Sequence, residues 1–242
     1  MDNAINRTIL VTGASSGIGH AIATLLLRQG YRVIGMARDF SKASFDSENF
    51  VAVSIDLSRL DELAARLETL INDEPAIDGV ICCAGSGRFG SLEEFSYPQI
   101  KALIDLNLTS QIYLARTLIP GMKQRARGDI IFMGSESART GGKRGAVYSA
   151  AKFGLRGLAQ SLRHECAASG VRVSIVNPGM VKTAFFDQLD FQPGDKPENY
   201  ILPEDVARAV LTILEARSGT VFDEINLSPQ KKVVRFPKPG KR

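Results

Sequence analysis

Short apolar runs alternate along the chain with longer segments in which apolar residues recur at helical spacing. The first run, at residues 8–12, leads into a glycine-rich turn and then a helical pattern that stops at Gly30. Runs rich in β-branched residues predict further strands at residues 31–36, 50–55, 79–83, 129–133, 171–176 and 219–227. Helical patterns between them predict helices at residues 60–70, 100–122, 147–168 and 205–216.

The order of these elements favours an α/β fold. Strands that are separated by helices need crossover connections, which produce a parallel sheet with helices on both faces. The predicted strands are apolar throughout rather than alternating with polar residues, as burial on both faces requires. We therefore expect one doubly wound domain at residues 1–230, with a seven-stranded parallel sheet, and a separate tail at residues 231–242.

The composition suits one globular domain and excludes several classes of protein. The 242 residues are 44% hydrophobic, which supplies a sizeable core. No apolar run reaches about 18 residues and no basic start precedes an apolar stretch, so we expect neither a membrane span nor a signal peptide. Three cysteines cannot form a disulfide framework and two histidines supply metal sites poorly, which favours a cytoplasmic protein without a metal site.

The formal net charge is +4, and basic residues gather at the end of the chain. The basic residues of this tail are Lys231, Lys232, Arg235, Lys238, Lys241 and Arg242. Because Pro237, Pro239 and Gly240 break any helix there, we expect a solvated, flexible segment, with contact to phosphate or an acidic partner as the alternative. No aromatic platform or recognition helix elsewhere indicates nucleic-acid binding.

The turn after the first predicted strand, Thr12-Gly13-Ala14-Ser15-Ser16-Gly17-Ile18-Gly19, is typical of a dinucleotide site. Glycines let the backbone approach a pyrophosphate, and the following helix presents free N–H groups and a partial positive charge. The same residues also fit the G-x-S-x-G elbow of serine hydrolases, with Ser15 as the nucleophile. That chemistry needs a late histidine base, and the only one, His164, falls inside a predicted helix, so we favour the dinucleotide site.

The end of the second predicted strand bears on which dinucleotide binds. An acidic side chain at this place holds the ribose hydroxyls of NAD, whereas an arginine accommodates the 2′-phosphate of NADP. Arg38 follows Gly19 by 19 residues, and Asp39 comes next. We therefore expect NADP(H), with NAD(H) as the alternative that Asp39 leaves open.

The start of the predicted helix at residues 147–168 carries the candidate chemistry. Tyr148 and Lys152 are four residues apart and so lie on one helix face. A nearby ammonium stabilises a phenolate, so we expect Lys152 to lower the pKa of Tyr148 from about 10 and make it a usable acid–base. Ser135 follows the fifth predicted strand, where ligands of open α/β sheets bind, and could hydrogen-bond a substrate oxygen.

Together with Asp56, Asn107 and Asn177-Pro178-Gly179, these residues resemble the short-chain dehydrogenase/reductase family over about residues 7–183. The resemblance implies a Rossmann-type domain with a T-G-x-x-x-G-x-G cofactor turn formed by Gly13, Ser15, Gly17, Ile18 and Gly19. Further implied cofactor contacts are Arg38, Asp56, Ala84, Gly85, Tyr148, Lys152, Pro178, Gly179, Val181 and Thr183. The implied catalytic residues are Ser135, Tyr148, Lys152 and Asn107.

The resemblance also implies individual roles. Asp56 contacts the adenine ring, Thr183 contacts the carboxamide, and Lys152 holds the nicotinamide ribose. Asn107 holds a water of the proton relay. Ser137 is a less suitable replacement for Ser135, because it is two residues too close to Tyr148 for the family's usual spacing.

Two segments depart from the family's pattern. Cys82-Cys83-Ala84-Gly85 stands where N-N-A-G is frequent, which concerns local stability rather than catalysis; we expect both cysteines to be buried rather than redox-active. Residues 222–229 replace a frequent acidic-diglycine ending, so oligomer contacts and one wall of the pocket are left open.

The resemblance implies hydride transfer between NADP(H) and a carbonyl or secondary alcohol, with Tyr148 exchanging the proton. A dinucleotide-sensing regulator without turnover is the alternative, but the filled catalytic positions favour an enzyme. Residues 184–202 resemble the family's variable substrate lid and are apolar enough to suggest a partly hydrophobic substrate, which leaves a 3-oxoacyl thioester, a 3-hydroxy acid, a sugar or a simple ketone open. A homodimer or homotetramer built on the helices at residues 103–122 and 147–168 is also implied.

Overall fold

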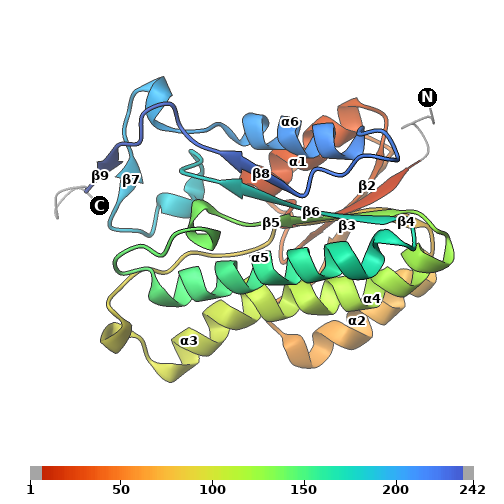
Figure 1. The fold of residues 1–242 in the computed structure, drawn as a ribbon, viewed down its shortest axis with the longest axis horizontal. Helices are drawn as coiled ribbons and strands as arrows, with labels where there is room; N and C mark the ends of the chain where they lie inside the picture. The colour runs from red at the N-terminus through yellow and green to blue at the C-terminus, as the bar shows by residue number, and fades with distance from the viewer. Residues whose placement is uncertain (1–6, 237–242) are drawn as a thin grey trace.

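The fold comes from a computed structural model that describes residues 7–236. Seven strands form one sheet in the order β3-β2-β1-β4-β5-β6-β8, and every neighbouring pair is parallel (Figure 1). The strands are β1 (Thr8–Thr12), β2 (Arg32–Ala37), β3 (Phe50–Ser54), β4 (Ile77–Cys82), β5 (Gly128–Met133), β6 (Val171–Pro178) and β8 (Glu224–Leu227). The doubly wound parallel sheet predicted from the sequence is confirmed.

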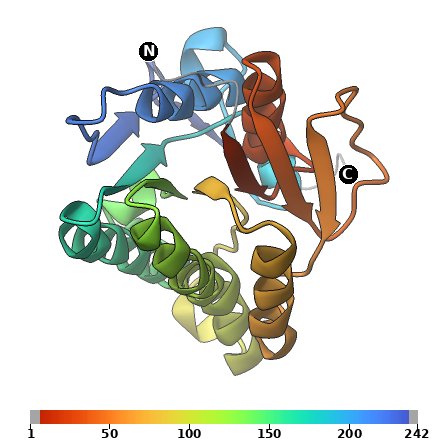
Figure 2. The same ribbon diagram turned by 90° about the vertical axis from the view of Figure 1, so that its right-hand side faces the viewer.

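Helices cover both faces of this sheet, as the end-on view shows (Figure 2). On one face α1 (Gly17–Arg28) packs beside α6 (Pro203–Leu214). On the other face lie α2 (Leu60–Asp73), α4 (Ser110–Gln124) and α5 (Ala146–Ala167), which contact one another in that order. Two separate apolar cores result, one on each side of the sheet.

The residues of β1 show why its sequence has no polar alternation. Ile9 and Val11 belong to the core under α1 and α6, whereas Leu10 belongs to the core under α2, α4 and α5. All three side chains are fully buried. A strand buried on both faces needs apolar side chains at every position, which is the pattern that predicted the sheet.

The helix predicted at residues 100–122 is interrupted in the structure. It begins as α3 (Tyr97–Ile104), widens into the π-helical segment η3 (Asp105–Thr109) and continues as α4. Side chains bond to backbone carbonyls around the widened turn: Asn107 Nδ2 donates to Leu103 O at 2.9 Å, and Ser110 Oγ donates to Leu106 O at 2.7 Å. Such π-helical turns often occur at functional sites, and this one carries Asn107.

The last described residues also differ from expectation. β9 (Val234–Arg235) pairs antiparallel with β7 (Gln192–Pro193), so the start of the basic tail crosses the segment expected to be the substrate lid (Figure 1). Lys231, Lys232 and Arg235 form ion pairs with Glu198, Glu136 and Asp195, respectively. Residues 231–236 are therefore held against the domain rather than free, while Lys238, Lys241 and Arg242 lie outside the described residues.

Four short 3₁₀ turns complete the described chain: η2 (Leu92–Glu94), η4 (Glu136–Ala138), η5 (Ala184–Phe186) and η6 (Pro197–Asn199). Within residues 7–236, no helix has both the length and the apolar character that crossing a bilayer requires.

Candidate active site

A cavity of about 730 Å³ opens at the carboxyl ends of the strands. Its place follows from the sheet order: the chain moves outward from β1 through β2 to β3, and then returns to start β4 on the other side of β1. Ligands of open α/β sheets bind where the strand order reverses in this way. Every site residue predicted from the sequence lines this cavity: Gly13, Ser15, Gly17, Ile18, Gly19, Arg38, Asp56, Ala84, Gly85, Asn107, Ser135, Tyr148, Lys152, Pro178, Gly179, Val181 and Thr183.

The glycine turn at the start of α1 is shaped for a large anionic group. Gly13 and Gly17 have φ angles of +70° and +53°, which disfavour residues with a Cβ, and a Cβ on Gly19 would clash with the carbonyl oxygen of Gly13. The N-cap residue Ser16 makes no side-chain cap bond, and the first turn of α1 contains no acidic residue. The helix N-terminus therefore keeps its unpaired N–H groups and its positive end for a ligand, which fits a pyrophosphate.

Thr12 fixes this turn to the end of β4. Its fully buried Oγ1 accepts hydrogen bonds from the backbone N–H groups of Cys83, at 2.9 Å, and Ala84, at 3.0 Å. Thr12 was not predicted to have a role of its own, although a polar residue at the end of an apolar strand is a visible signal. Thr12 thus sets the position of the loop that carries Ala84 and Gly85.

The two adjacent cysteines are held as thiols. Burial raises the pKa of Cys83 to about 12, and it raises the pKa of Cys82 further. Both are free of disulfides; Cys82 is buried as expected, whereas Cys83 is only half-buried because it lines the cavity. Since the thiolate is the reactive form, these pKa directions argue against redox chemistry here.

Tyr148, Lys152 and Ser135 meet at the floor of the cavity. Both α5 side chains are buried, and Lys152 Nζ donates to the carbonyl oxygen of Met133 at 2.9 Å. Lys152 Nζ lies 5.7 Å from the centroid of the Tyr148 ring. The Ser135 side chain lies close enough to lower the pKa of Tyr148, and its Oγ accepts from the backbone N–H of Ser137 at 3.1 Å. Ser137 thereby orients Ser135 through its backbone.

We expected Lys152 to lower the pKa of Tyr148, and this prediction is wrong for the polypeptide without a cofactor. Burial raises the pKa of Tyr148 to about 12, and the opposing hydrogen bond from Ser135 does not offset it. Burial also lowers the pKa of Lys152 to about 8. The four-residue spacing identified two neighbours, but it carried no information on how completely both would be removed from water.

Asn107 and Gly85 form the polar corner behind this group. Asn107 Nδ2 donates to Ser86 O at 3.0 Å, whereas its buried Oδ1 has no hydrogen-bond partner. A Cβ placed on Gly85 would lie 2.7 Å from that oxygen and 3.8 Å from Lys152 Nζ. The absence of a side chain at Gly85 thus keeps an open acceptor and a buried cation within reach of one small polar group, which fits a water of a proton relay.

The other end of the cavity carries the charges expected for ribose and adenine binding. Asp56 Oδ1 accepts from Ser58 N and Oγ at 2.9 and 2.7 Å; burial opposes ionisation, but these bonds and the charge of Arg38 hold the pKa of Asp56 below its usual value. Arg38 is exposed and lines the cavity. Asp39 is outside the cavity lining, and its two carboxylate oxygens accept from Ser41 N and Oγ at 2.8 and 2.6 Å.

The serine-hydrolase alternative lacks its base. Among the described residues that line the cavity there is no histidine. His20 stacks on Phe45, with 4.8 Å between ring centroids, and His164 lies near the end of α5. Ser15 is thus in the cavity without a group to accept its proton. The described part of the chain also contains no group of three or more His, Cys, Asp or Glu side chains that could hold a metal ion.

Some cavity residues were not anticipated. These are Glu136 and Phe89, which line the cavity beside Tyr148. Phe185, Phe186 and Phe191 also line it, and they come from the apolar segment that was expected to be the lid. The position of Glu136 directly after Ser135 was a usable signal. No sequence signal pointed to Phe89, because it lies in an irregular loop after β4 that has no periodic pattern.

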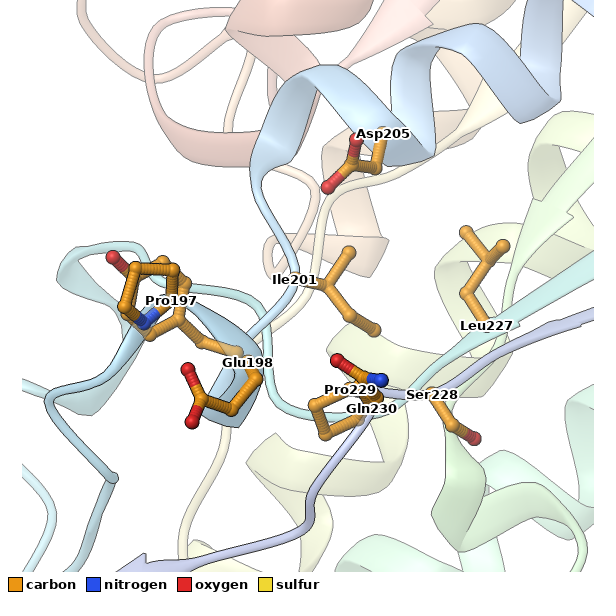
Figure 3. Close-up of a pocket in the computed structure, with 9 residues that line it drawn as sticks. Pro197, Glu198, Ile201, Asp205, Leu227, Ser228, Pro229 and Gln230 are labelled. Atoms are coloured by element: carbon orange, nitrogen blue, oxygen red, sulfur yellow. The ribbon is translucent and has the colours of Figure 1, made fainter.

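A second hollow, of about 590 Å³, lies outside the cavity (Figure 3). Its walls come from the lid's end, including Pro197, Glu198 and Ile201, and from residues 227–230, which begin with the last residue of β8. It contains none of the site residues predicted from the sequence. The candidate chemistry is therefore confined to the cavity at the strand ends.

Comparison with known proteins agrees with this geometry. The family described as short chain dehydrogenase matches residues 7–193. An uncharacterised oxidoreductase of Staphylococcus saprophyticus is 30% identical over 232 residues, which cover 93% of this chain and 97% of the relative. A solved metagenomic short-chain oxidoreductase in complex with NADP is 30% identical, with a TM-score of 0.79, and the match covers 95% of this chain and 100% of that one.

A second solved structure extends the likeness to a named activity. It is an alcohol dehydrogenase from the archaeon Thermococcus sibiricus in complex with 5-hydroxy-NADP, 25% identical with a TM-score of 0.83, and the match covers 94% of this chain and 99% of that one. The sheet order, the glycine turn and the full-length matches agree, and this chain belongs to the short-chain dehydrogenase/reductase family of oxidoreductases.

Proposed function

We propose that this protein is an NADP(H)-dependent oxidoreductase that interconverts a carbonyl group and a secondary alcohol. The observation that carries the proposal is that Ser135, Tyr148 and Lys152 line the same cavity as the glycine turn. A bound nicotinamide supplies or accepts the hydride at the reacting carbon. The NADP complex and the alcohol dehydrogenase among the solved relatives support the same chemistry.

The protein's own groups handle the proton. With its pKa raised to about 12, Tyr148 keeps its proton at neutral pH and can donate it to the carbonyl oxygen during reduction. Ser135 orients that oxygen through its hydroxyl. The charge of Lys152 compensates the phenolate that remains, and the corner between Lys152, Gly85 and Asn107 Oδ1 leads a proton back to Tyr148. In oxidation the same groups work in the reverse direction.

Arg38 favours NADP over NAD. Its side chain lines the cavity, and no hydrogen bond or ion pair of its guanidinium occurs among residues 7–236, whereas Asp39 points its carboxylate at Ser41. A guanidinium suits a 2′-phosphate, and a carboxylate engaged elsewhere does not serve the ribose hydroxyls of NAD. Arg38→Gln should weaken NADP binding about 10-fold or more and leave NAD binding nearly as it was, measured by calorimetric titration of both dinucleotides. Equal losses for both would contradict the assignment.

Kinetics of single substitutions test the catalytic roles. Tyr148→Phe, Ser135→Ala and Lys152→Met should each lower kcat for ketone reduction by about 100-fold or more, because each removes a group that acts on the transferring proton. Circular dichroism and NADP titration of the same variants check that fold and cofactor site persist. Near-normal turnover in Tyr148→Phe would refute the mechanism. Binding of NADPH without consumption across a broad ketone panel would favour the dinucleotide-sensing regulator instead.

We further propose a homodimer or homotetramer assembled through α4 and α5. Ile112 on α4 and Phe153 on α5 expose large apolar side chains, which are 38% and 43% exposed. Exposed apolar side chains on neighbouring helices are typical of subunit contacts. Phe153→Asp should lower the mass measured by light scattering, and an unchanged mass would contradict this interface.

A further inference from the structure

Five aromatic rings form a closed circuit at the end of the cavity that holds Tyr148. The Tyr148 ring centroid lies 5.2 Å from that of Phe89 and 6.3 Å from that of Phe185. Phe89 continues to Phe191 at 4.9 Å, and Phe185 continues to Phe186 at 5.3 Å. Phe186 and Phe191 close the circuit at 5.8 Å. All five residues line the cavity, so a substrate that reaches the Tyr148 hydroxyl passes among ring faces and edges.

The rings come from segments far apart in sequence. Phe89 lies in the loop after β4, Tyr148 near the start of α5, and the other three in the lid after β6. Gly87 makes room for one of them, because a Cβ there would clash with the Phe185 ring. Phe185 remains 36% exposed at the mouth, whereas Phe186 is buried beneath it. The circuit thus runs from the reacting hydroxyl to the entrance.

At the end of the cavity that holds Tyr148, the charged lining residues are either acidic or already hydrogen-bonded within the protein. Glu136 and Asp187 line the cavity here, and Glu136 acts on the pKa of Tyr148 through its charge. Lys152 is the one cation here among the described lining residues, and it is buried with Nζ on the Met133 carbonyl. Arg38, the other basic lining residue of the described chain, lies at the opposite, ribose end beside Asp56.

Two basic side chains near the lid are engaged by acidic partners, whereas Arg88, next to Phe89 in the sequence, lies with its Cζ 5.9 Å from the centroid of the Phe95 ring. Arg144 pairs with Asp190 at 2.8 Å, and Lys232 pairs with Glu136 at 2.7 Å. A carboxylate or phosphate entering here would lose water, would face Glu136 and Asp187, and would find no cation other than the buried Lys152 among the described residues that line this end.

Resting on the proposed function, we propose that the substrate is an uncharged ketone or secondary alcohol with an aromatic ring beside the reacting carbon, and that anionic substrates are rejected. The ring would stack edge-on or offset against Phe89 and Phe185 beside the reacting oxygen on Tyr148. The carboxylate of Asp187, which has no ion pair among residues 7–236, and the charge of Glu136 supply the discrimination against anions. Sugars lack the apolar ring that this circuit matches, and acyl thioesters of phosphate-bearing carriers bring the charge that it excludes.

Four α-keto compounds test the effect of an aromatic ring and the effect of a negative charge separately. They are methyl benzoylformate, benzoylformate, methyl pyruvate and pyruvate, and all four carry the same reacting ketone group. With NADPH, kcat/KM should be highest for methyl benzoylformate, about 100-fold above benzoylformate and about 10-fold above methyl pyruvate. Equal values across the set, or preference for either anion, would overturn this inference while the proposed function stands. If none of the four consumes NADPH while simple ketones do, or while simple alcohols reduce NADP⁺, the substrate inference alone fails. If no carbonyl compound consumes NADPH and no alcohol reduces NADP⁺, the proposed function fails and takes the inference with it.

Variants tie the preference to the residues that cause it. Phe89→Leu should reduce the ratio of kcat/KM for methyl benzoylformate over methyl pyruvate about 5-fold or more, because it removes the ring nearest Tyr148. Tyr97→Leu is the control, since Tyr97 is 89% exposed on α3 and outside the cavity lining. Asp187→Lys, at an exposed position, should raise kcat/KM for benzoylformate about 10-fold relative to its methyl ester, and Asp187→Asn should give a smaller rise.

A binding measurement gives a readout that does not depend on turnover. In the presence of NADP⁺, methyl mandelate should raise the thermal midpoint of the protein, whereas mandelate at the same concentration should leave it unchanged. A midpoint that rises equally with both ligands would overturn the rejection of anions. A midpoint that rises with neither, while methyl lactate raises it, would overturn the role of the ring.

Discussion

At the residue scale, burial opposes charge on both members of the Tyr148–Lys152 pair. Because the pKa of Lys152 falls from 10.5 to about 8 on folding, the unfolded chain binds more protons at this position between those two pH values. Stability contributed by this group therefore rises with pH across that window. Relative to Lys152→Met, the wild-type protein should gain free energy of unfolding from pH 8 to pH 10.5, measured by urea titration. Tyr148 titrates in both proteins, so parallel pH profiles would contradict the shifted lysine.

Thr12 gives a second prediction at this scale. Thr12→Val keeps the shape of the side chain but leaves the Ala84 N–H without its acceptor, whereas the Cys83 N–H keeps the Ile81 carbonyl at 3.0 Å. We expect the free energy of unfolding to fall by roughly 1–3 kcal/mol, which is the usual cost of one donor left unpaired. NADP affinity should fall as well, since the loop with Gly85 shifts. Thr12→Ser retains the oxygen and should keep most of the stability and most of the NADP affinity. Similar losses in Thr12→Ser and Thr12→Val would show that the methyl group of Thr12 matters instead.

At the scale of elements, the lid is held by a segment from the end of the chain. Gly194 N donates to Val233 O at 3.0 Å, and Arg235 and Lys232 pair with Asp195 and Glu136. Exposed ion pairs contribute little one at a time, but reversing both charges adds repulsion along the whole contact. Lys232→Glu combined with Arg235→Glu should speed proteolytic cleavage within residues 192–199 severalfold. The control is Arg116→Glu combined with Arg208→Glu, which makes the same change in net charge on α4 and α6. Equal cleavage in both double variants would contradict the conclusion that residues 232–235 hold the lid in place.

The elements also show where sequence reasoning stops. The strands were predictable because each is a continuous apolar run, and the site residues because most of them follow the carboxyl end of one. The π-helical turn at Asp105–Thr109 could not be predicted, because Leu106 and Leu108 continue the apolar pattern of the helix across it. The β7–β9 pairing joins two-residue strands that are 40 residues apart, too short for any periodicity. The raised pKa of Tyr148 could not be predicted either, because it results from burial, and the four-residue spacing of Tyr148 and Lys152 says nothing about burial.

At the scale of the whole molecule, a buried ionic cluster lies at the end of the sheet opposite the cavity. Asp129, near the start of β5, accepts from Arg172 Nε at 2.7 Å and Nη2 at 3.0 Å and also pairs with Arg7. Arg172 donates further to the carbonyls of Leu214 and Ala216 at the end of α6. The Asp129 side chain is only 3% exposed. The cluster therefore joins β1, β5, β6 and α6 without touching the site.

Removing the central carboxylate separates stability from catalysis. Asp129→Asn leaves two arginines without their buried counter-charge, so we expect the free energy of unfolding to fall by roughly 3 kcal/mol. Asp223→Asn breaks the exposed pair with Arg163 and should cost at most about 1 kcal/mol. Below the unfolding transition, kcat and KM of Asp129→Asn should match the wild type, because the cavity lies at the carboxyl ends of the strands and Asp129 near an amino end. A loss of turnover in the folded variant would show that the two ends of the sheet are coupled.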